Sequence, residues 1–132
     1  MNGNRDAAHC PCLSGEQYGE CCGRFHSGCS EAATAEQLMR SRYSAFAFLD
    51  AGYLRRTHHP DTAPAELELD PEMEWRRLDI VSTSRGGPLD IEGTVEFKAY
   101  YRHGPERGVL HEASRFVREG GRWYYVDGTF LD

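Results

Sequence analysis

Hydrophobic and polar positions along the chain change their period near residue 75. In residues 34–50, apolar side chains recur every three or four positions, which predicts an amphipathic helix. These positions are Leu38, Met39, Tyr43, Phe46 and Leu49. Thr34 and Gln37 have the spacing of a capping box at the start of this helix, and Gly52 can end it.

A second, shorter helix is expected over residues 53–58. It must stop before Pro60, because the residue that precedes a proline is disfavoured in the helical conformation. Residues 60–74 contain three of the six prolines together with several carboxylates. This composition predicts a loop or a short helical crossing between the helices and the segment that follows.

From Trp75 onward the pattern alternates with a period of two, which is typical of strands. The expected strands cover residues 75–84, 89–103, 109–119 and 122–130. In the second of them, one face is expected to carry Ile91, Val95, Phe97, Ala99 and Tyr101. Gly120 and Gly121 predict a tight hairpin between the last two strands. Helices followed by an antiparallel meander indicate an α+β fold, with the helices packed on one face of a curved sheet.

Composition narrows the class of protein. The chain has 132 residues, of which 39% are hydrophobic, enough for one globular domain and a small appendage. Its formal net charge of -6 disfavours general nucleic-acid binding. No apolar run approaches the ~20 residues that span a bilayer. The first ten residues lack the apolar segment of a secretory signal, so we expect a cytoplasmic protein whose thiols stay reduced.

All five cysteines lie within residues 9–29. Cys10 and Cys12 are separated from the adjacent pair Cys21 and Cys22 by eight residues. Pro11 stiffens the first pair, and the turn formers Ser14 and Gly15 let the chain reverse between the two pairs. Four thiolates at tetrahedral corners suit Zn²⁺, and metal binding would hold this short segment folded.

Other interpretations of the cysteine cluster stay open at this point. A Cys21–Cys22 disulfide would close a strained ring, and a redox-active pair usually has Cys-x-x-Cys spacing, which is absent. His26 or Cys29 could replace one zinc ligand, and His9 precedes the cluster.

The stretch CPCLSGEQYGECCGRFHSG resembles the SEC-C motif, a small zinc-binding module found at the C-terminus of the SecA translocase motor and in many bacterial proteins. The resemblance implies one ligand set: Cys10, Cys12, Cys21 and Cys22. This sequence has Leu13 where the motif commonly has Gly, which alters the turn but removes no ligand.

The rest of the chain resembles the YchJ-like family, in the fragments LMRSRYSAFAF, YLRRTHHP, FKAYYR and LHEASRFVREGGRWYYVDG. The resemblance implies a SEC-C-like module in residues 1–30 and an NTF2-like domain in residues 31–132. An NTF2-like domain is a cone of helices and curved sheet that often encloses a cavity, and it serves as an enzyme in some proteins and as a binding module in others. His58 stands where the family typically has Trp, so a pocket at this position is expected to differ.

Polar residues within the predicted third strand suggest a site. Glu112 and Ser114 share one face with Leu110 and Phe116, and His111, Ala113, Arg115 and Val117 share the other, so either orientation places a polar group beside the core. The expected ligand pocket is lined by Arg42, Tyr43, His59, Glu112 and Arg115. The alternative is a buried Arg42–Glu112 ion pair that only fixes how the helix docks on the sheet.

Three functional hypotheses follow. The first is a binding or adaptor protein, whose zinc module docks to a protein partner and whose NTF2-like cavity holds a small ligand. The second is a small enzyme with His59 or His111 as general base. The third is a thiol or zinc redox sensor. The resemblance also makes a homodimer through the sheets plausible.

Overall fold

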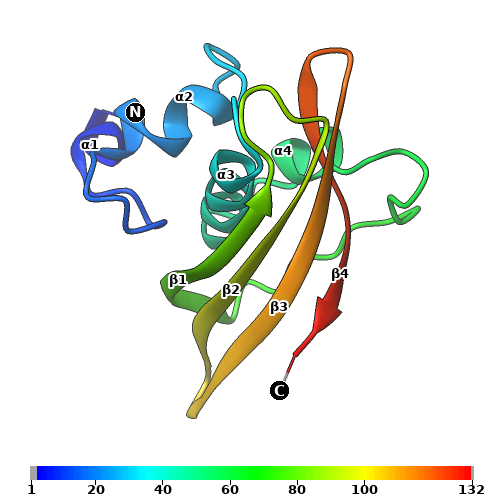
Figure 1. Cartoon of the computed structure of the whole chain (residues 1–132). Helices are drawn as coiled ribbons and strands as arrows, with labels where there is room; N and C mark the ends of the chain where they lie inside the picture. Colours follow the sequence, from blue (N-terminus) through cyan, green and yellow to red (C-terminus); the bar gives the residue numbers. More distant parts are fainter. Residues whose placement is uncertain (1–2, 132) are drawn as a thin grey trace.

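The computed structural model describes residues 3–131 and contains two layers, with helices packed against one face of a twisted sheet (Figure 1). The helices are α1 (Gly3–Ala7), α2 (Cys22–His26), α3 (Ala35–Ala47) and α4 (Ala51–Arg56), with a short 3₁₀ helix over Tyr18–Glu20. The strands are β1 (Met73–Arg85), β2 (Glu92–His103), β3 (Glu106–Glu119) and β4 (Arg122–Phe130). The strands pair antiparallel in the order β1-β2-β3-β4, which confirms the predicted α+β meander.

Helix α3 begins where its capping residues predict. The backbone N–H of Gln37 donates to the Thr34 hydroxyl at 3.1 Å. The side chain of Gln37 accepts from the backbone N–H of Ala33 at 2.8 Å, one residue before the position that a capping box uses. The helix buries Leu38, Met39 and Tyr43 and contacts β1, β2 and β4.

The prediction that Gly52 ends this helix is wrong. The helix stops at Ala47, and Leu49 takes a left-handed conformation with φ of 57°, which lets the N–H of Asp50 reach the carbonyl of Ala45 at 2.8 Å. The Asp50 side chain then accepts from the N–H of Tyr53 at 3.1 Å and begins α4, so Gly52 lies inside the second helix.

The inner face of the sheet follows the predicted alternation for most of its length. Val95, Phe97 and Ala99 are buried on β2. Ile91 was expected to continue this face, but it precedes β2 and is 72% exposed, because the chain is still leaving the turn after β1. Gly120 and Gly121 both have positive φ, 59° and 80°, as a two-residue hairpin requires.

The chain after α4 runs beside the outer edge of β4. The N–H of Tyr125 donates to the carbonyl of Thr57, and the N–H of His59 donates to the carbonyl of Tyr125, each at 2.8 Å. This parallel bridge, centred on His58, extends the sheet locally beyond its fourth strand.

One continuous core joins the cysteine segment to the sheet. Cys10, Cys12, Cys21 and Cys22 belong to the same buried cluster as Leu38, Tyr43, Phe97, Phe116 and Trp123. The indole N–H of Trp123 also donates to the carbonyl of Ala33 at 3.1 Å, which ties β4 to the segment before α3. Within residues 3–131, no helix is both long and apolar enough to cross a bilayer.

Candidate metal centre and cavity

The four cysteines of the predicted ligand set converge on one point. Cys10 and Cys12 lie in the turn after α1, and Cys21 and Cys22 lie at the junction of the 3₁₀ helix and α2. Their Sγ atoms all lie within 4.8 Å of one another. The Sγ of Cys21 is 3.6 Å from that of Cys12 and 4.0 Å from that of Cys22.

These separations fit a tetrahedral metal ion. Sulfur atoms about 2.3 Å from a central zinc are separated by about 3.8 Å along each tetrahedral edge. All five cysteines of the chain are free thiols, so no disulfide joins Cys21 to Cys22. The cluster can therefore hold a metal with protein ligands alone.

The local backbone explains why the first pair of thiols faces the second. The N–H of Cys10 donates to the carbonyl of Glu16, and the N–H of Leu13 donates to the carbonyl of Cys10, each at 3.0 Å. Leu13 and Gly15 both have positive φ, 62° and 93°, which turns the chain back on itself. The Ser14 hydroxyl lies 3.1 Å from the Sγ of Cys21 and links the turn to the second pair.

Burial and hydrogen bonding favour the protonated form of two thiols of the cluster, Cys21 and Cys22. Burial raises the pKa of Cys21 to about 11. Hydrogen bonding to Cys10 and Cys12, followed by burial, raises the pKa of Cys22. Hydrogen bonds from Cys12 and Cys22 instead lower the pKa of Cys10, so one thiolate forms most readily there. A bound cation would compensate the charge of the remaining thiolates.

The other cysteine and histidine candidates lie outside this cluster. Both ring nitrogens of His26 are engaged, since Nδ1 lies 2.5 Å from the Tyr18 hydroxyl and Nε2 lies 2.8 Å from the carbonyl of Ser41. Cys29 and His9 are exposed. Arg24, whose charge could offset the thiolates, donates through Nε to the Cys21 carbonyl at 3.2 Å.

A cavity of about 290 Å³ lies between α3, the loop after α4 and the inner face of the sheet. Its apolar lining includes Met39, Phe46, Leu67, Trp75, Phe97, Ala99 and Leu110. Its polar lining consists of Arg42, Tyr43, His58, Glu112, Ser114 and Tyr125. The cavity is therefore apolar over most of its wall and polar where β3 and β4 meet α3.

Glu112 and Arg42 occupy this polar part without forming a direct ion pair. Glu112 accepts a hydrogen bond from the Ser114 hydroxyl at 2.5 Å. Arg42 donates through Nη1 to the carbonyl of Leu54 at 2.9 Å and to the Thr57 hydroxyl at 2.7 Å. No ion pair within residues 3–131 includes either side chain, so the predicted alternative of an Arg42–Glu112 pair is wrong.

The ring of Tyr125 stands close to both charges. The guanidinium carbon of Arg42 lies 4.6 Å from the ring centroid. Burial, and then the charge of Glu112, raises the pKa of Tyr125 to about 12, and burial lowers the pKa of Arg42 to about 10. The Tyr43 hydroxyl is also buried and has no hydrogen-bond partner among the described residues.

The structure brings Arg42, Tyr43 and Glu112 of the predicted pocket together and places the other two residues elsewhere. His59 pairs through Nε2 with Glu119 at 3.0 Å. Arg115 lies on the exposed face, where its guanidinium makes two bonds to Asp127, because β3 turns Glu112, Ser114 and Phe116 inward.

The predicted lining did not include the apolar residues of this cavity or three of its polar residues, which are His58, Ser114 and Tyr125. The signal for His58 was its position in place of the Trp that is typical of the family. For Ser114, the signal was its place on the same strand face as Glu112. His111, the other predicted base, pairs with Glu96 at 2.7 Å and does not line the cavity.

Comparisons with known proteins agree with both parts of the structure. A family model described as "YchJ, middle NTF2-like domain" matches residues 34–128. A UPF0225 protein of Streptomyces coelicolor is 55% identical over 123 residues, which cover 93% of this chain and 96% of the relative. A UPF0225 protein of Corynebacterium glutamicum is 51% identical over 119 residues, with 90% and 94% covered.

Two solved structures are similar in fold, and both are described as SEC-C motif containing proteins. The solution structure of one from Rhodopseudomonas palustris has a TM-score of 0.81 and 35% identity, and the match covers 93% of this chain and 98% of that one. The crystal structure of one from Psychrobacter arcticus has a TM-score of 0.75 and 29% identity, with 98% and 86% covered. The resemblance expected from the motifs is confirmed: this chain belongs to the YchJ-like family of UPF0225 proteins.

Proposed function

We propose that this protein binds a small, largely apolar molecule with one hydrogen-bond donor in the cavity of its NTF2-like domain, and that Zn²⁺ at the cysteine cluster holds the fold in shape. The observation that supports ligand binding is Glu112, a residue that is 9% exposed and lines a mostly apolar cavity, with no cationic side chain in an ion pair with its carboxylate among the described residues. A buried carboxylate without a direct ionic partner is costly unless another group compensates it.

Zinc suits the chemistry of the donor set. Four thiolates complete a tetrahedral site and leave no open position for water or substrate, which is the pattern of a structural zinc. The predicted cytoplasmic location would keep these thiols reduced and available to the metal. The cluster sulfurs are buried, which argues for a structural role over redox sensing.

The cavity is suited to a ligand smaller than most drug-sized molecules. Its volume of about 290 Å³ is at the lower end of the range for ligand pockets. Trp75 and Phe97 offer flat apolar contacts, and Glu112 offers a charged acceptor for an ammonium, amide or hydroxyl group. The Tyr43 hydroxyl, which has no hydrogen-bond partner within residues 3–131, is a second polar group of the same cavity.

Native mass spectrometry of protein purified without added metal tests the zinc part of the proposal, and a ligand titration tests the cavity part. We expect one zinc per chain in the wild type and in Ala99→Leu, whose larger side chain would enter the cavity from β2. Titration with benzylamine is followed by tryptophan fluorescence, to which Trp75 in the cavity wall contributes. It should show saturable binding in the wild type, at least tenfold weaker binding in Glu112→Gln, and none in Ala99→Leu. Equal benzylamine binding in all three proteins would overturn the ligand proposal.

The two histidines that the enzymatic hypothesis names as bases, His59 and His111, lie outside the cavity, and the hypothesis stays a prediction. Docking of the zinc module to a protein partner and formation of a homodimer stay predictions. Comparison of the proteins captured by the wild type and by a Cys21→Ser/Cys22→Ser variant would test the docking.

A further inference from the structure

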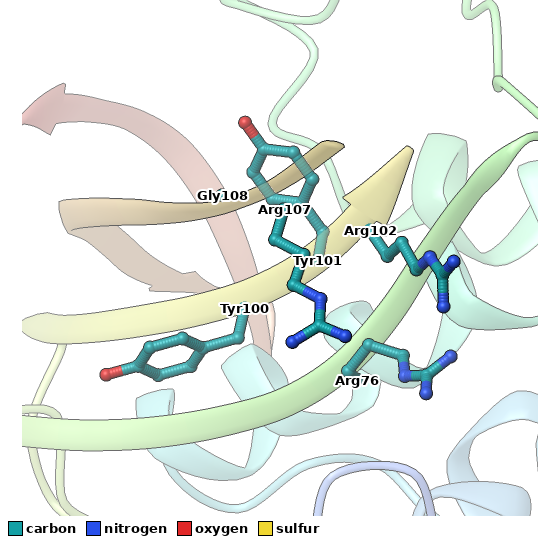
Figure 2. Close-up of a pocket in the computed structure, with 6 residues that line it drawn as sticks. All are labelled: Arg76, Tyr100, Tyr101, Arg102, Arg107 and Gly108. Atoms are coloured by element: carbon teal, nitrogen blue, oxygen red, sulfur yellow. The ribbon is translucent and has the colours of Figure 1, made fainter. Parts of the chain in front are cut away.

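Three arginines from neighbouring strands gather where β2 turns into β3. Arg76 lies on β1, Arg102 on β2 and Arg107 on β3, and together with Tyr100, Tyr101 and Gly108 they line a hollow of about 260 Å³ (Figure 2). Figure 2 shows the Arg107 side chain reaching across β2, so that its guanidinium lies between Tyr100 and Arg76. No residue lines both this hollow and the inner cavity.

The register of the sheet accounts for this clustering. Arg102 and Arg107 are direct partners across the β2–β3 ladder. The pairing of β1 with β2 shifts between Trp75 and Arg77, which leaves Arg76 as the extra residue of a β-bulge. A bulge re-aims the side chain that it carries, and such bulges are common beside binding sites.

Glu74, which lies opposite Arg102 across the β1–β2 ladder, offsets only part of the charge of the three guanidinium groups. Arg76 pairs with Glu74 at 3.2 Å, and both side chains are exposed. Arg102 donates through Nε to the carbonyl of Gly104 at 3.0 Å, and the Arg107 side chain makes no hydrogen bond or ion pair with residues 3–131. Like charges directly opposite each other on adjacent strands are destabilising. This local excess of positive charge lies on a chain whose net charge is -6.

We propose that this hollow binds the phosphoryl group of a small organic phosphate. Guanidinium groups present planar pairs of N–H donors that match phosphate oxygens, and three of them can surround a dianion. The size of the hollow leaves room for more than the phosphate itself, and Tyr100 lies on its rim. An occupant of this charge would relieve the repulsion between Arg102 and Arg107.

Titration of the full chain by NMR tests the proposal, with inorganic phosphate and adenosine 5′-monophosphate as probes. We expect saturable shifts of the Arg76, Arg102 and Arg107 resonances with a Kd below about 1 mM. Arg107→Gln should weaken binding of both probes at least fivefold. The matched control is Arg122→Gln, which removes the same charge from another exposed position, where Arg122 faces Glu31 at 3.4 Å. The control should bind like the wild type.

The two probes also distinguish the source of the phosphoryl group. Tighter binding of the nucleotide, with shifts at Tyr100, would indicate a ligand that carries a ring. Equal affinities would indicate that the phosphate alone is recognised. Shifts that rise linearly without saturation up to about 20 mM, or equal affinities of Arg107→Gln and the wild type, would overturn the proposal, because a built site saturates and depends on its own arginines.

Discussion

The hydroxyl of Ser44, in the last turn of α3, lies 3.5 Å from the Sγ of Cys10. The cysteine cluster therefore contacts the main helix of the NTF2-like domain directly. The carbonyl of Cys12 accepts a further hydrogen bond from Nη1 of Arg40 at 2.9 Å, one turn earlier on the same helix.

Loss of the metal should therefore destabilise the whole chain. We expect the Cys22→Ser variant, and the wild type after removal of metal by a strong chelator, to unfold more than about 10 °C below the metal-loaded wild type. The reason is that a structural zinc contributes several kcal/mol to folding. The matched control is Cys29→Ser, whose thiol is exposed and outside the cluster, and its midpoint should not change. The thermal midpoint is measured from the circular dichroism signal of the β-sheet. A sheet that melts at the same temperature with and without metal would show that the two parts fold independently.

Leu13→Gly should stabilise the protein. Leu13 holds a φ of 62° in the turn between the two cysteine pairs, and a side chain in this region costs about 1 kcal/mol that glycine does not. The side chain is 53% exposed, so little burial is lost. Leu13→Ala is the matched control, because it removes nearly the same atoms but keeps the Cβ. Urea unfolding should rank Gly above Ala by about 1 kcal/mol, and the reverse order would contradict the argument.

Gly128 provides the space in which the Glu112 carboxylate lies. A Cβ at position 128 would overlap the carboxylate of Glu112. Gly128→Ala should therefore cost about 1–3 kcal/mol of unfolding free energy in the wild type. In a Glu112→Ala background the same change should cost less than half as much, because the overlapping group is gone. Additive effects in this double-mutant cycle would show that Gly128 is required for another reason.

His58 should make stability depend on pH. Burial, followed by the charge of Arg42, lowers the pKa of His58 from its ordinary value of 6.5. Near pH 6.5 the imidazole is protonated in the unfolded chain but still neutral in the folded chain. The free energy of unfolding therefore decreases as the pH falls from 6.5 towards the lowered pKa. His58→Gln should lose less stability than the wild type between pH 7.5 and pH 5.5 in urea unfolding. An unchanged pH dependence in His58→Gln would show that His58 is not its source.

The sequence determined the elements better than their ends. The periodicity over residues 34–50 located α3, and the capping bond between Thr34 and Gln37 confirmed its start. Its end depended on the left-handed conformation of Leu49, which no pattern of hydrophobic residues reveals. Gly52 was expected to end α3 because glycine readily adopts the left-handed conformation. Instead, the Asp50 side chain caps α4, which begins before Gly52.

The metal centre could be predicted from the sequence, whereas the lining of the cavity could be predicted only in part. The short spacing between the four cysteines predicted that their side chains meet at one site, because these metal ligands are close together in sequence. The cavity depended on which face of β3 turns inward, and both faces carry a charged residue, so alternation alone left Glu112 and Arg115 equivalent. The burial of Phe116 in the core decided between them, because Phe116 shares the face of Glu112.

The bridge between residues 57–59 and Tyr125 has a consequence for encounters between chains. An edge strand has unpaired N–H and C=O groups that can pair with an extended segment of another chain, which favours aggregation. Here the N–H and the C=O of Tyr125 are already taken by Thr57 and His59. The segment that leads from α4 to the sheet thereby shields the first half of β4 from recruitment into a foreign sheet.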